Sequence, residues 1–150
     1  MAAWSALLVA HCRVTAVLDR ELRQRIGMTL DDYDVLYQLR VAGEPIRMAT
    51  LAERVLVSRP TASRAVDRLV ANGWIRRWHD EQDRRVVLLE LTGEGRRQQS
   101  RAGRVHVDGI ARLVGAPLVD RDVAALTDSL RALAAGAEEE TGRSRTSATG

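Results

Sequence analysis

The chain contains no phenylalanine and no lysine, and only one cysteine and three prolines among its 150 residues. The single cysteine, Cys12, excludes an intramolecular disulfide and any metal site built from cysteines alone, and it fits a cytoplasmic location. Because only five residues are aromatic, leucine, valine and alanine must fill the core. The content of hydrophobic residues (45%) and charged residues (29%) is that of ordinary globular proteins. Wholesale disorder is therefore excluded, and we expect one compact domain.

A long hydrophobic run is also missing near the start of the chain. Residues 1–10 are apolar, but this run is too short to span a bilayer and no basic segment precedes it. The following Ala10-His11-Cys12 does not resemble a signal-peptide cleavage site. We therefore expect this segment to belong to a helix of the mature protein and expect no membrane partner.

All 23 basic side chains are arginines, and they are unevenly distributed. Residues 54–104 hold 12 arginines and 6 acidic residues, a local charge of +6, whereas the rest of the chain has a charge of −3. Such a local excess favours a polyanionic partner such as nucleic acid, although solvated surface arginines give the same signal.

The first 41 residues predict two helices. Apolar residues recur every three or four positions over residues 4–26, which is typical of an amphipathic helix. Gly27 ends this helix. Thr29 can cap a second helix that continues to about Val41, with acidic residues in its first turn.

The central segment predicts two closely spaced helices and a hairpin. A short helical stretch covers residues 49–55. Ser58 can cap a helix over 59–71, which can include Pro60 because proline is tolerated in a first turn. Residues 74–78 and 86–91 are rich in β-branched and apolar side chains, which favours paired strands joined by a charged turn.

The last third predicts two more helices. Thr92 can cap one of them, which begins near Glu94 and is broken by Gly115 and Pro117, and the other begins at Asp120 or Asp122. Residues 136–150 are small, polar and without periodicity, so we expect them to form a disordered tail. The predicted fold class is mainly α with a small β-hairpin, and residues 30–92 have the element order of a winged helix-turn-helix, in which the second helix enters the major groove of DNA.

Short motifs in the same segment carry a family resemblance. The hairpin combines Asp83-Arg84-Arg85 with a strand ending in Leu91-Thr92. The helix-turn-helix contains, in order, Leu51-Ala52-Glu53-Arg54, Val57-Ser58-Arg59-Pro60-Thr61-Ala62-Ser63-Arg64, Val66-Asp67-Arg68-Leu69 and Asn72-Gly73-Trp74-Ile75-Arg76-Arg77. Together these motifs resemble the MarR family of bacterial transcriptional regulators, over about residues 4–135.

The resemblance implies a single domain over residues 1–135, in which helices 4–26 and 94–135 form a homodimer. It also implies a DNA-binding regulator, in most cases a repressor, that reads a pseudo-palindromic operator on double-stranded DNA and needs no cofactor. In the family, the arginine that matches Arg85 enters the minor groove and the aspartate that matches Asp83 orients it. The candidate DNA-contacting residues are Ser58, Arg59, Thr61, Ser63, Arg64, Arg68, Arg77, Asp83, Arg84 and Arg85.

Regulation by a small molecule is a further expectation. Polar side chains on an otherwise apolar wall suit an aromatic or phenolic effector, and we predict that His11, Thr15, Tyr33 and Tyr37 contribute to its site. The alternative is that Tyr33 and Tyr37 are ordinary core residues. Arg68 likewise has the alternative of pairing with Asp67 or Glu53 on a solvated face.

Other classes of function have weaker support. Cys12 does not match the position of the peroxide-sensing cysteine in some members of the family. The histidines have no metal-ligand spacing, although a dimer could unite some of them, so a metal-sensing repressor stays an alternative. No catalytic motif is present, and we expect no enzyme. A helical protein-interaction module, in which the basic segment is only a soluble surface, also stays an alternative.

Overall fold

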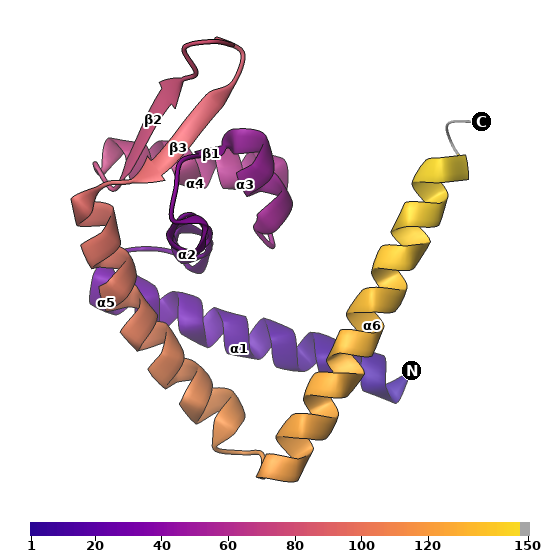
Figure 1. The fold of residues 1–150 in the computed structure, drawn as a ribbon. Helices are drawn as coiled ribbons and strands as arrows, with labels where there is room; N and C mark the ends of the chain where they lie inside the picture. The colour runs from indigo at the N-terminus through magenta and orange to yellow at the C-terminus, as the bar shows by residue number, and fades with distance from the viewer. Residues whose placement is uncertain (148–150) are drawn as a thin grey trace. The chain divides into compact units, whose positions relative to one another are not determined.

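The computed structural model describes residues 1–147, which form helices and a small antiparallel sheet (Figure 1). The chain divides into two compact units at Gly109 and Ile110. This boundary falls within the segment that the sequence predicts as dimerisation helices. In order, the elements are α1 (Ala2–Ile26), α2 (Leu30–Ala42), β1 (Ile46–Arg47), α3 (Met48–Arg54), α4 (Arg59–Ala71), β2 (Ile75–His79), β3 (Val87–Leu91), α5 (Gly93–Ile110), a π-helical segment (Ala111–Gly115) and α6 (Asp120–Ser147).

The signals at the ends of the first two helices are confirmed. Gly27 ends α1 in the left-handed conformation, with a φ of 77°, which favours glycine because it has no Cβ. Thr29 and Asp32 form a capping box, in which each side chain accepts a hydrogen bond from the other residue's backbone N–H, at 2.9 and 3.0 Å. These local interactions fix where α2 begins.

The sheet has three strands in the order β1-β3-β2, whereas the sequence predicts only the β2–β3 hairpin. The additional strand, β1, pairs Ile46 with Leu89 and Arg47 with Leu88. A strand of two residues has no measurable periodicity, so the sequence does not predict it. It forms because β3 offers a free edge for pairing.

Aliphatic residues fill the core of the first unit, as the absence of phenylalanine predicts. Leu22, Leu36, Leu51, Leu69 and Leu89 are fully buried, and they come from five different elements. The buried core contains one aromatic side chain among the described residues, that of Tyr33. This core holds α4 and the hairpin in one unit.

Thr92 connects the sheet to α5. Its hydroxyl donates to the carbonyl oxygen of Gly73 at 2.8 Å and accepts from the N–H of Gly95 at 3.0 Å, which confirms it as a helix cap. Gly95 lies against the backbone of Trp74 so closely that an added Cβ would overlap the Trp74 carbonyl oxygen. The start of α5 is therefore fixed against the residue that leads into β2.

α1 is long and apolar enough to cross a membrane by length and composition alone, although core helices of soluble proteins meet the same criterion. Near its C-terminal end, Leu18 and Leu22 are buried. Near its N-terminal end, Trp4, Leu8 and Val9 are exposed, with Trp4 at 59% of its full accessible area. The N-terminal half of α1 thus presents an apolar surface.

The second unit contains α6, which continues to Ser147. The expectation of a disordered tail is therefore wrong for residues 136–147, while residues 148–150 lie outside the described part of the chain. Three consecutive glutamates favour helix, no proline interrupts the segment, and extending an existing helix costs less than starting a new one.

Candidate DNA interface

The N-terminus of α4 is capped as the sequence predicts. Ser58 accepts a hydrogen bond from the backbone N–H of Thr61 at 3.4 Å, and the two hydroxyl oxygens lie 3.0 Å apart. Pro60 lies in the first turn, where its missing N–H removes no helical hydrogen bond. In this turn Thr61 and Ala62 both donate to Ser58 and Pro60 has no N–H, so the backbone N–H of Arg59 is the one left for a ligand such as a phosphate group.

α4 has one buried face and one polar exposed face. The buried face consists of Ala62, Ala65, Val66 and Leu69, so the helix cannot rotate without exposing the core. On the opposite side, the predicted contact residues Ser58, Arg59, Ser63 and Arg64 are exposed, and Thr61 is half-buried. The structure therefore brings these five residues together on one surface.

Two arginines on this surface keep donors available for a ligand. Arg64 donates one hydrogen bond to the hydroxyl of Thr61, at 3.2 Å, which holds the guanidinium near the helix while its other N–H groups stay unused. Arg59 has no side-chain partner within residues 1–147. Both side chains can therefore bind phosphate or base edges without first breaking an ion pair.

Arg68 lies on α4 but its guanidinium faces α2. It donates two hydrogen bonds to Oδ1 of Asp32, at 2.7 and 3.2 Å, and that carboxylate also serves the capping box of α2. The Asp32 side chain is only 8% exposed, whereas that of Arg68 is 47% exposed. The pairing with Asp67 or Glu53 suggested by the sequence is wrong, because α2 packs beside α4 and offers a better-buried acceptor. We assign Arg68 to the stability of the fold.

Arg77 also forms an ion pair inside the fold. Its Nη1 lies 2.5 Å from Oδ1 of Asp67, so the pair connects β2 with α4. Arg76 lies on the same strand, 2.8 Å from Glu90 and with its guanidinium 4.5 Å from the centre of the Trp78 ring. The Arg77–Asp67 pair holds the hairpin in place relative to α4 and involves a residue predicted to contact DNA, whereas the contacts of Arg76 lie within the hairpin.

Two aspartates organise the turn between β2 and β3. We call the hairpin of β2, this turn and β3 the wing. Oδ1 of Asp80 accepts hydrogen bonds from the backbone N–H groups of Gln82, at 2.8 Å, and Asp83, at 3.0 Å. These bonds hold the pKa of Asp80 below its ordinary value of 3.8. Asp83 in turn accepts from the backbone N–H of Arg85 at 2.9 Å. Asp83 therefore positions the backbone of Arg85, and within residues 1–147 the two side chains form no ion pair.

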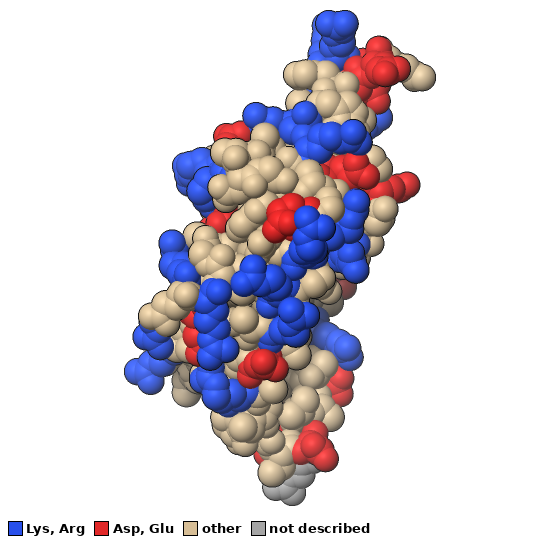
Figure 2. All heavy atoms as spheres, turned by 90° about the vertical axis from the view of Figure 1, so that its left-hand side faces the viewer, with Lys and Arg blue, Asp and Glu red and all other residues tan. Residues whose placement is uncertain are grey.

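The surface of the wing and α5 carries many arginines. Figure 2, which shows the side of the molecule on which these elements lie, has blue arginine side chains interspersed with fewer red acidic ones. Arg84 and Arg85 at the wing are exposed, as are Arg59 and Arg64 on α4. Positive potential thus extends from α4 to the wing, which suits the phosphate backbone of DNA.

The predicted effector residues are only partly brought together. The rings of Tyr33 and Tyr37 lie 6.2 Å apart, and the ring of His106 lies 4.6 Å from that of Tyr33. The hydroxyl of Thr15 donates to the carbonyl oxygen of His11 at 2.7 Å, within the same helix. Among the described residues, no contact links either of these two side chains to the tyrosines. Burial and the neighbouring Tyr37 and Asp34 raise the pKa of Tyr33.

Sequence reasoning missed His106, because a single histidine in a polar helix has no periodic partner. Nδ1 of His106 is buried without a hydrogen-bond partner among the described residues, and burial lowers the pKa of the ring. Among residues 1–147, no three His, Cys, Asp or Glu side chains lie close enough to hold a metal ion. Cys12 is exposed as a free thiol.

Known proteins share both the sequence motifs and this fold. The MarR family model matches residues 28–87. The regulator Sco3205 from Streptomyces coelicolor, solved in complex with DNA, is 31% identical, with a TM-score of 0.81 over 89% of this chain and 84% of that chain. The chain belongs to the MarR family. MarR-family regulators are not enzymes, in agreement with the expectation from the sequence.

Two other relatives support the MarR assignment. AbsC, a MarR-family regulator from Streptomyces coelicolor, is 27% identical with a TM-score of 0.81, over 92% of this chain and 93% of that chain. The regulator PecS from Dickeya dadantii is 32% identical over 101 residues, which are 64% of this chain and 61% of PecS. The match therefore spans about three fifths of this curated relative.

Proposed function

We propose that this MarR-family chain is a homodimeric transcriptional repressor that binds a pseudo-palindromic DNA operator and responds to a small-molecule effector. The observation that carries the proposal is the exposed face of α4, where uncommitted arginines and short hydroxyl side chains lie together above a buried face that fixes the helix. The fold of the MarR family supplies the element order that such an interface needs.

The recognition helix α4 reads the major groove. Arg59 and Arg64 can each bind a guanine through two hydrogen bonds, worth ~1–3 kcal/mol of discrimination for a well-placed pair. Ser58 and the backbone N–H of Arg59 bind a phosphate, and Ser63 contacts a base edge or a phosphate. In support, the 31% identical Sco3205 and the 25% identical MarR from E. coli have both been solved with DNA.

The wing reads the minor groove through Arg85. The two aspartate turns hold the backbone at Arg85, so little conformational freedom of the main chain is lost on binding. A narrow minor groove has enhanced negative potential, which favours a guanidinium placed in it. Arg84, which is exposed beside it, contacts the phosphate backbone, and Arg77 adds a phosphate contact through donors that Asp67 does not use.

Dimerisation covers apolar surface that the single chain leaves exposed. α1 exposes Trp4 and Leu8, and α6 exposes Val123, Leu126, Leu130 and Leu133 at spacings of three and four residues. An exposed apolar stripe of this kind marks an interface. Two recognition helices related by a two-fold axis read half-sites about one helical turn apart, ~34–36 Å.

The effector is an aromatic or phenolic acid, and the repressor acts in the cytoplasm. Tyr33, Tyr37, His11 and Thr15 remain our proposal for its contacts, supported by the 6.2 Å separation of the two tyrosine rings. Regulation of DNA binding by 6-hydroxynicotinic acid is described for BpsR from Bordetella bronchiseptica, whose 22% identity to this chain shows a common fold only.

The test measures, by fluorescence anisotropy, the affinity of the protein for an operator fragment selected from the source genome. We expect Arg85→Ala to weaken binding about tenfold and Arg101→Ala, which changes an exposed arginine of α5 outside the interface, to leave it unchanged. The affinity should also fall steeply as salt rises. Affinity that is independent of salt and of Arg85 would instead support a protein-interaction module.

A further inference from the structure

A cleft of about 370 Å³ lies between α4 and the wing, two neighbouring parts of the first unit (Figure 1). Met48 and Val87 supply apolar side chains to its lining, and Ser63, Arg77 and His79 supply polar ones. No acidic residue is among the described residues that line it. We call it the α4–wing cleft. Among its three polar residues, His79 has no role in the proposed function.

Strand alternation places His79 on the side of the wing that faces α4. Side chains two residues apart on a strand share one face of the sheet. Ile75 is buried in the core, and Arg77 is paired with Asp67 of α4. His79 follows them on the same face. Its partner in the β2–β3 register, Val87, packs against the core and confirms this direction.

Ser63 and His79 each lie one step along the chain from the ion pair between Asp67 and Arg77. Ser63 precedes Asp67 by about one turn of α4, a rise of about 5.4 Å. His79 follows Arg77 by two residues of β2, a rise of about 6.6 Å. The ion pair therefore joins α4 to the wing at one position, and at the next position Ser63 and His79 both line the cleft.

The hydrogen-bonding groups of these two residues are unused. Ser63 and His79 are exposed, and within residues 1–147 neither the hydroxyl nor the imidazole ring has a hydrogen-bond partner. The guanidinium of Arg77 uses Nη1 for its bond to Asp67, so its other N–H groups stay available. The α4–wing cleft thus offers donors from three side chains to a ligand with acceptor oxygens.

A DNA duplex bound as proposed above brings such a ligand to the cleft. In that complex α4 lies in the major groove and Arg85 of the wing lies in the minor groove. One sugar-phosphate backbone separates a major groove from the minor groove beside it. A chain that reads both grooves therefore has to hold that backbone between its two reading elements.

The lining of the cleft fits a segment of this backbone. A phosphate carries a negative charge on oxygens that accept hydrogen bonds, and bonds to a charged acceptor are stronger than bonds between neutral groups. Met48 and Val87 are half-buried, so each keeps apolar surface that a deoxyribose can contact. Because the lining contains no acidic residue, it does not repel the phosphate.

We propose that the α4–wing cleft holds the phosphate between the two grooves and that the imidazole ring of His79 donates a hydrogen bond to it, beside the Ser63 hydroxyl. The proposal rests on the proposed function and adds a contact to it. A phosphate held by both elements fixes how far the wing lies from α4 along the DNA. His79 is thus a positioning residue, which sets the register between reading of the major groove and reading of the minor groove.

Neutral linkages in the DNA backbone test this contact. Each phosphate of the operator is replaced in turn by a methylphosphonate, which has no charge, and the affinity of the full-length protein is measured by fluorescence anisotropy. For the native protein we expect replacement of the phosphate between the grooves to weaken binding about tenfold. His79→Ala should bind the natural operator about tenfold more weakly, and the same replacement should weaken that variant only about twofold further.

Two further variants serve as controls. His79→Gln keeps an N–H donor and should restore most of the affinity and of the sensitivity to the neutral linkage. His11→Ala removes a histidine from an exposed position of α1 and should behave like the native protein at every linkage. Circular dichroism shows whether each variant is folded.

The outcomes separate this contact from the proposed function. Equal sensitivity of the native protein and His79→Ala at every linkage would overturn the proposal, and so would an affinity of His79→Gln as low as that of His79→Ala. Operator binding that depends on Arg85 but not on His79 would contradict the phosphate contact alone. A native protein that binds no operator would contradict the proposed function as well.

Discussion

Single arginine residues in this protein divide into two groups with different tasks. Arg68 and Arg77 are committed to carboxylates of neighbouring elements, at 2.7 and 2.5 Å. Arg59 and Arg85 make no side-chain ion pair within residues 1–147. The residue type is the same throughout, so the location of an acidic partner decides which arginines offer all their donors to DNA and which, like Arg77, offer only the remaining ones.

Arg68 and Arg64 provide a direct test of this division. Arg68→Ala leaves the buried Asp32 carboxylate without two hydrogen bonds, so we expect the free energy of unfolding to fall by ~1.5–3 kcal/mol. Arg64→Ala removes an exposed side chain and should change it by less than ~0.5 kcal/mol while weakening operator binding. Urea denaturation and anisotropy measure the two effects. The reverse pattern would show that the assignments of the two arginines are exchanged.

His106 should make stability depend on pH. Burial lowers its pKa in the folded state below the ordinary value of 6.5, so the unfolded state binds the proton more readily. The contribution of His106 to the free energy of unfolding is therefore fully present above about pH 6.5 and is lost as the pH drops below that value.

Urea denaturation at about pH 7.5 and about pH 5.5, at one protein concentration, measures this dependence. We expect the native protein to be less stable at the lower pH and His106→Gln to show a smaller difference between the two. His79→Gln, at an exposed position of β2, serves as the control and should keep the native difference. An unchanged pH dependence in His106→Gln would contradict the role of burial.

At the scale of elements, the wing depends on backbone geometry set by side chains. Asp83→Ala removes a negative charge, so simple electrostatics predicts tighter DNA binding. We expect weaker binding, by about three- to tenfold, because the hydrogen bond that fixes the Arg85 backbone is lost. Asp83→Asn keeps an acceptor and should restore most of the affinity. Tighter binding by Asp83→Ala in anisotropy titrations would show that the turn does not position Arg85.

The junction between the sheet and α5 predicts opposite effects for two glycines of one helix. Gly95→Ala forces a Cβ into the Trp74 carbonyl and should destabilise the protein by ~3 kcal/mol. Gly103→Ala places its Cβ at 3.8 Å from Gln99 and Tyr33, an ordinary contact, and should stabilise by up to ~1 kcal/mol through helix propensity. Thermal unfolding followed by circular dichroism measures both. Similar effects of the two substitutions would contradict the close approach at Gly95.

The elements that the sequence predicts correctly are those with local signals. The caps at Thr29, Ser58 and Thr92 each act within three or four residues, so they can be recognised in the sequence. The interactions that were missed join distant positions. Arg68 and Asp32 are 36 residues apart, and β1 depends on an edge of β3 that no local pattern reveals.

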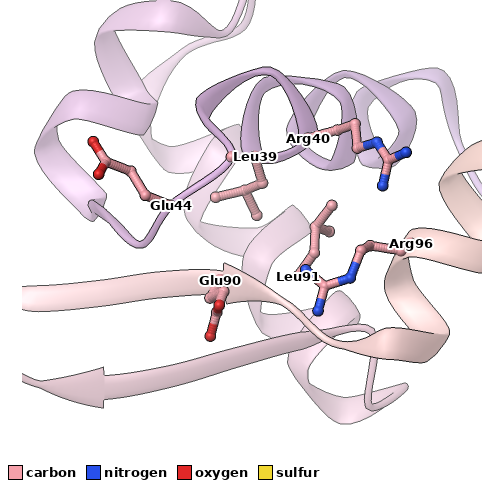
Figure 3. A pocket seen from close by; sticks show the side chains of 7 residues that line it. Leu39, Arg40, Glu44, Glu90, Leu91 and Arg96 are labelled. Atoms are coloured by element: carbon pink, nitrogen blue, oxygen red, sulfur yellow. The ribbon is translucent and has the colours of Figure 1, made fainter.

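The same distinction holds for the candidate site. The exposed face of α4 follows from its periodicity, because the buried alanines and leucine define which side remains outside. The pocket drawn in Figure 3 combines residues 39–44 with residues 90–96. Its combination of arginines with buried leucines follows from packing of α2, β3 and α5, which local sequence patterns do not specify.

The whole molecule presents the expected interfaces on different elements. The first unit carries α4 and the wing, and the second carries α6 with its exposed apolar stripe. In the proposed dimer, two copies place two recognition helices on one duplex, so affinity and specificity both depend on the two-fold symmetry of the pair. The pairing therefore determines which DNA sequences the protein can read.

Hydroxyl-radical footprinting of fragments selected from the source genome tests this dimeric reading most directly. We expect a two-fold symmetric site with protected half-sites centred one helical turn, ~34–36 Å, apart and two chains bound per duplex. An asymmetric footprint with one chain per duplex, or no sequence preference among the selected fragments, would contradict a dimer that reads DNA through α4 and the wing.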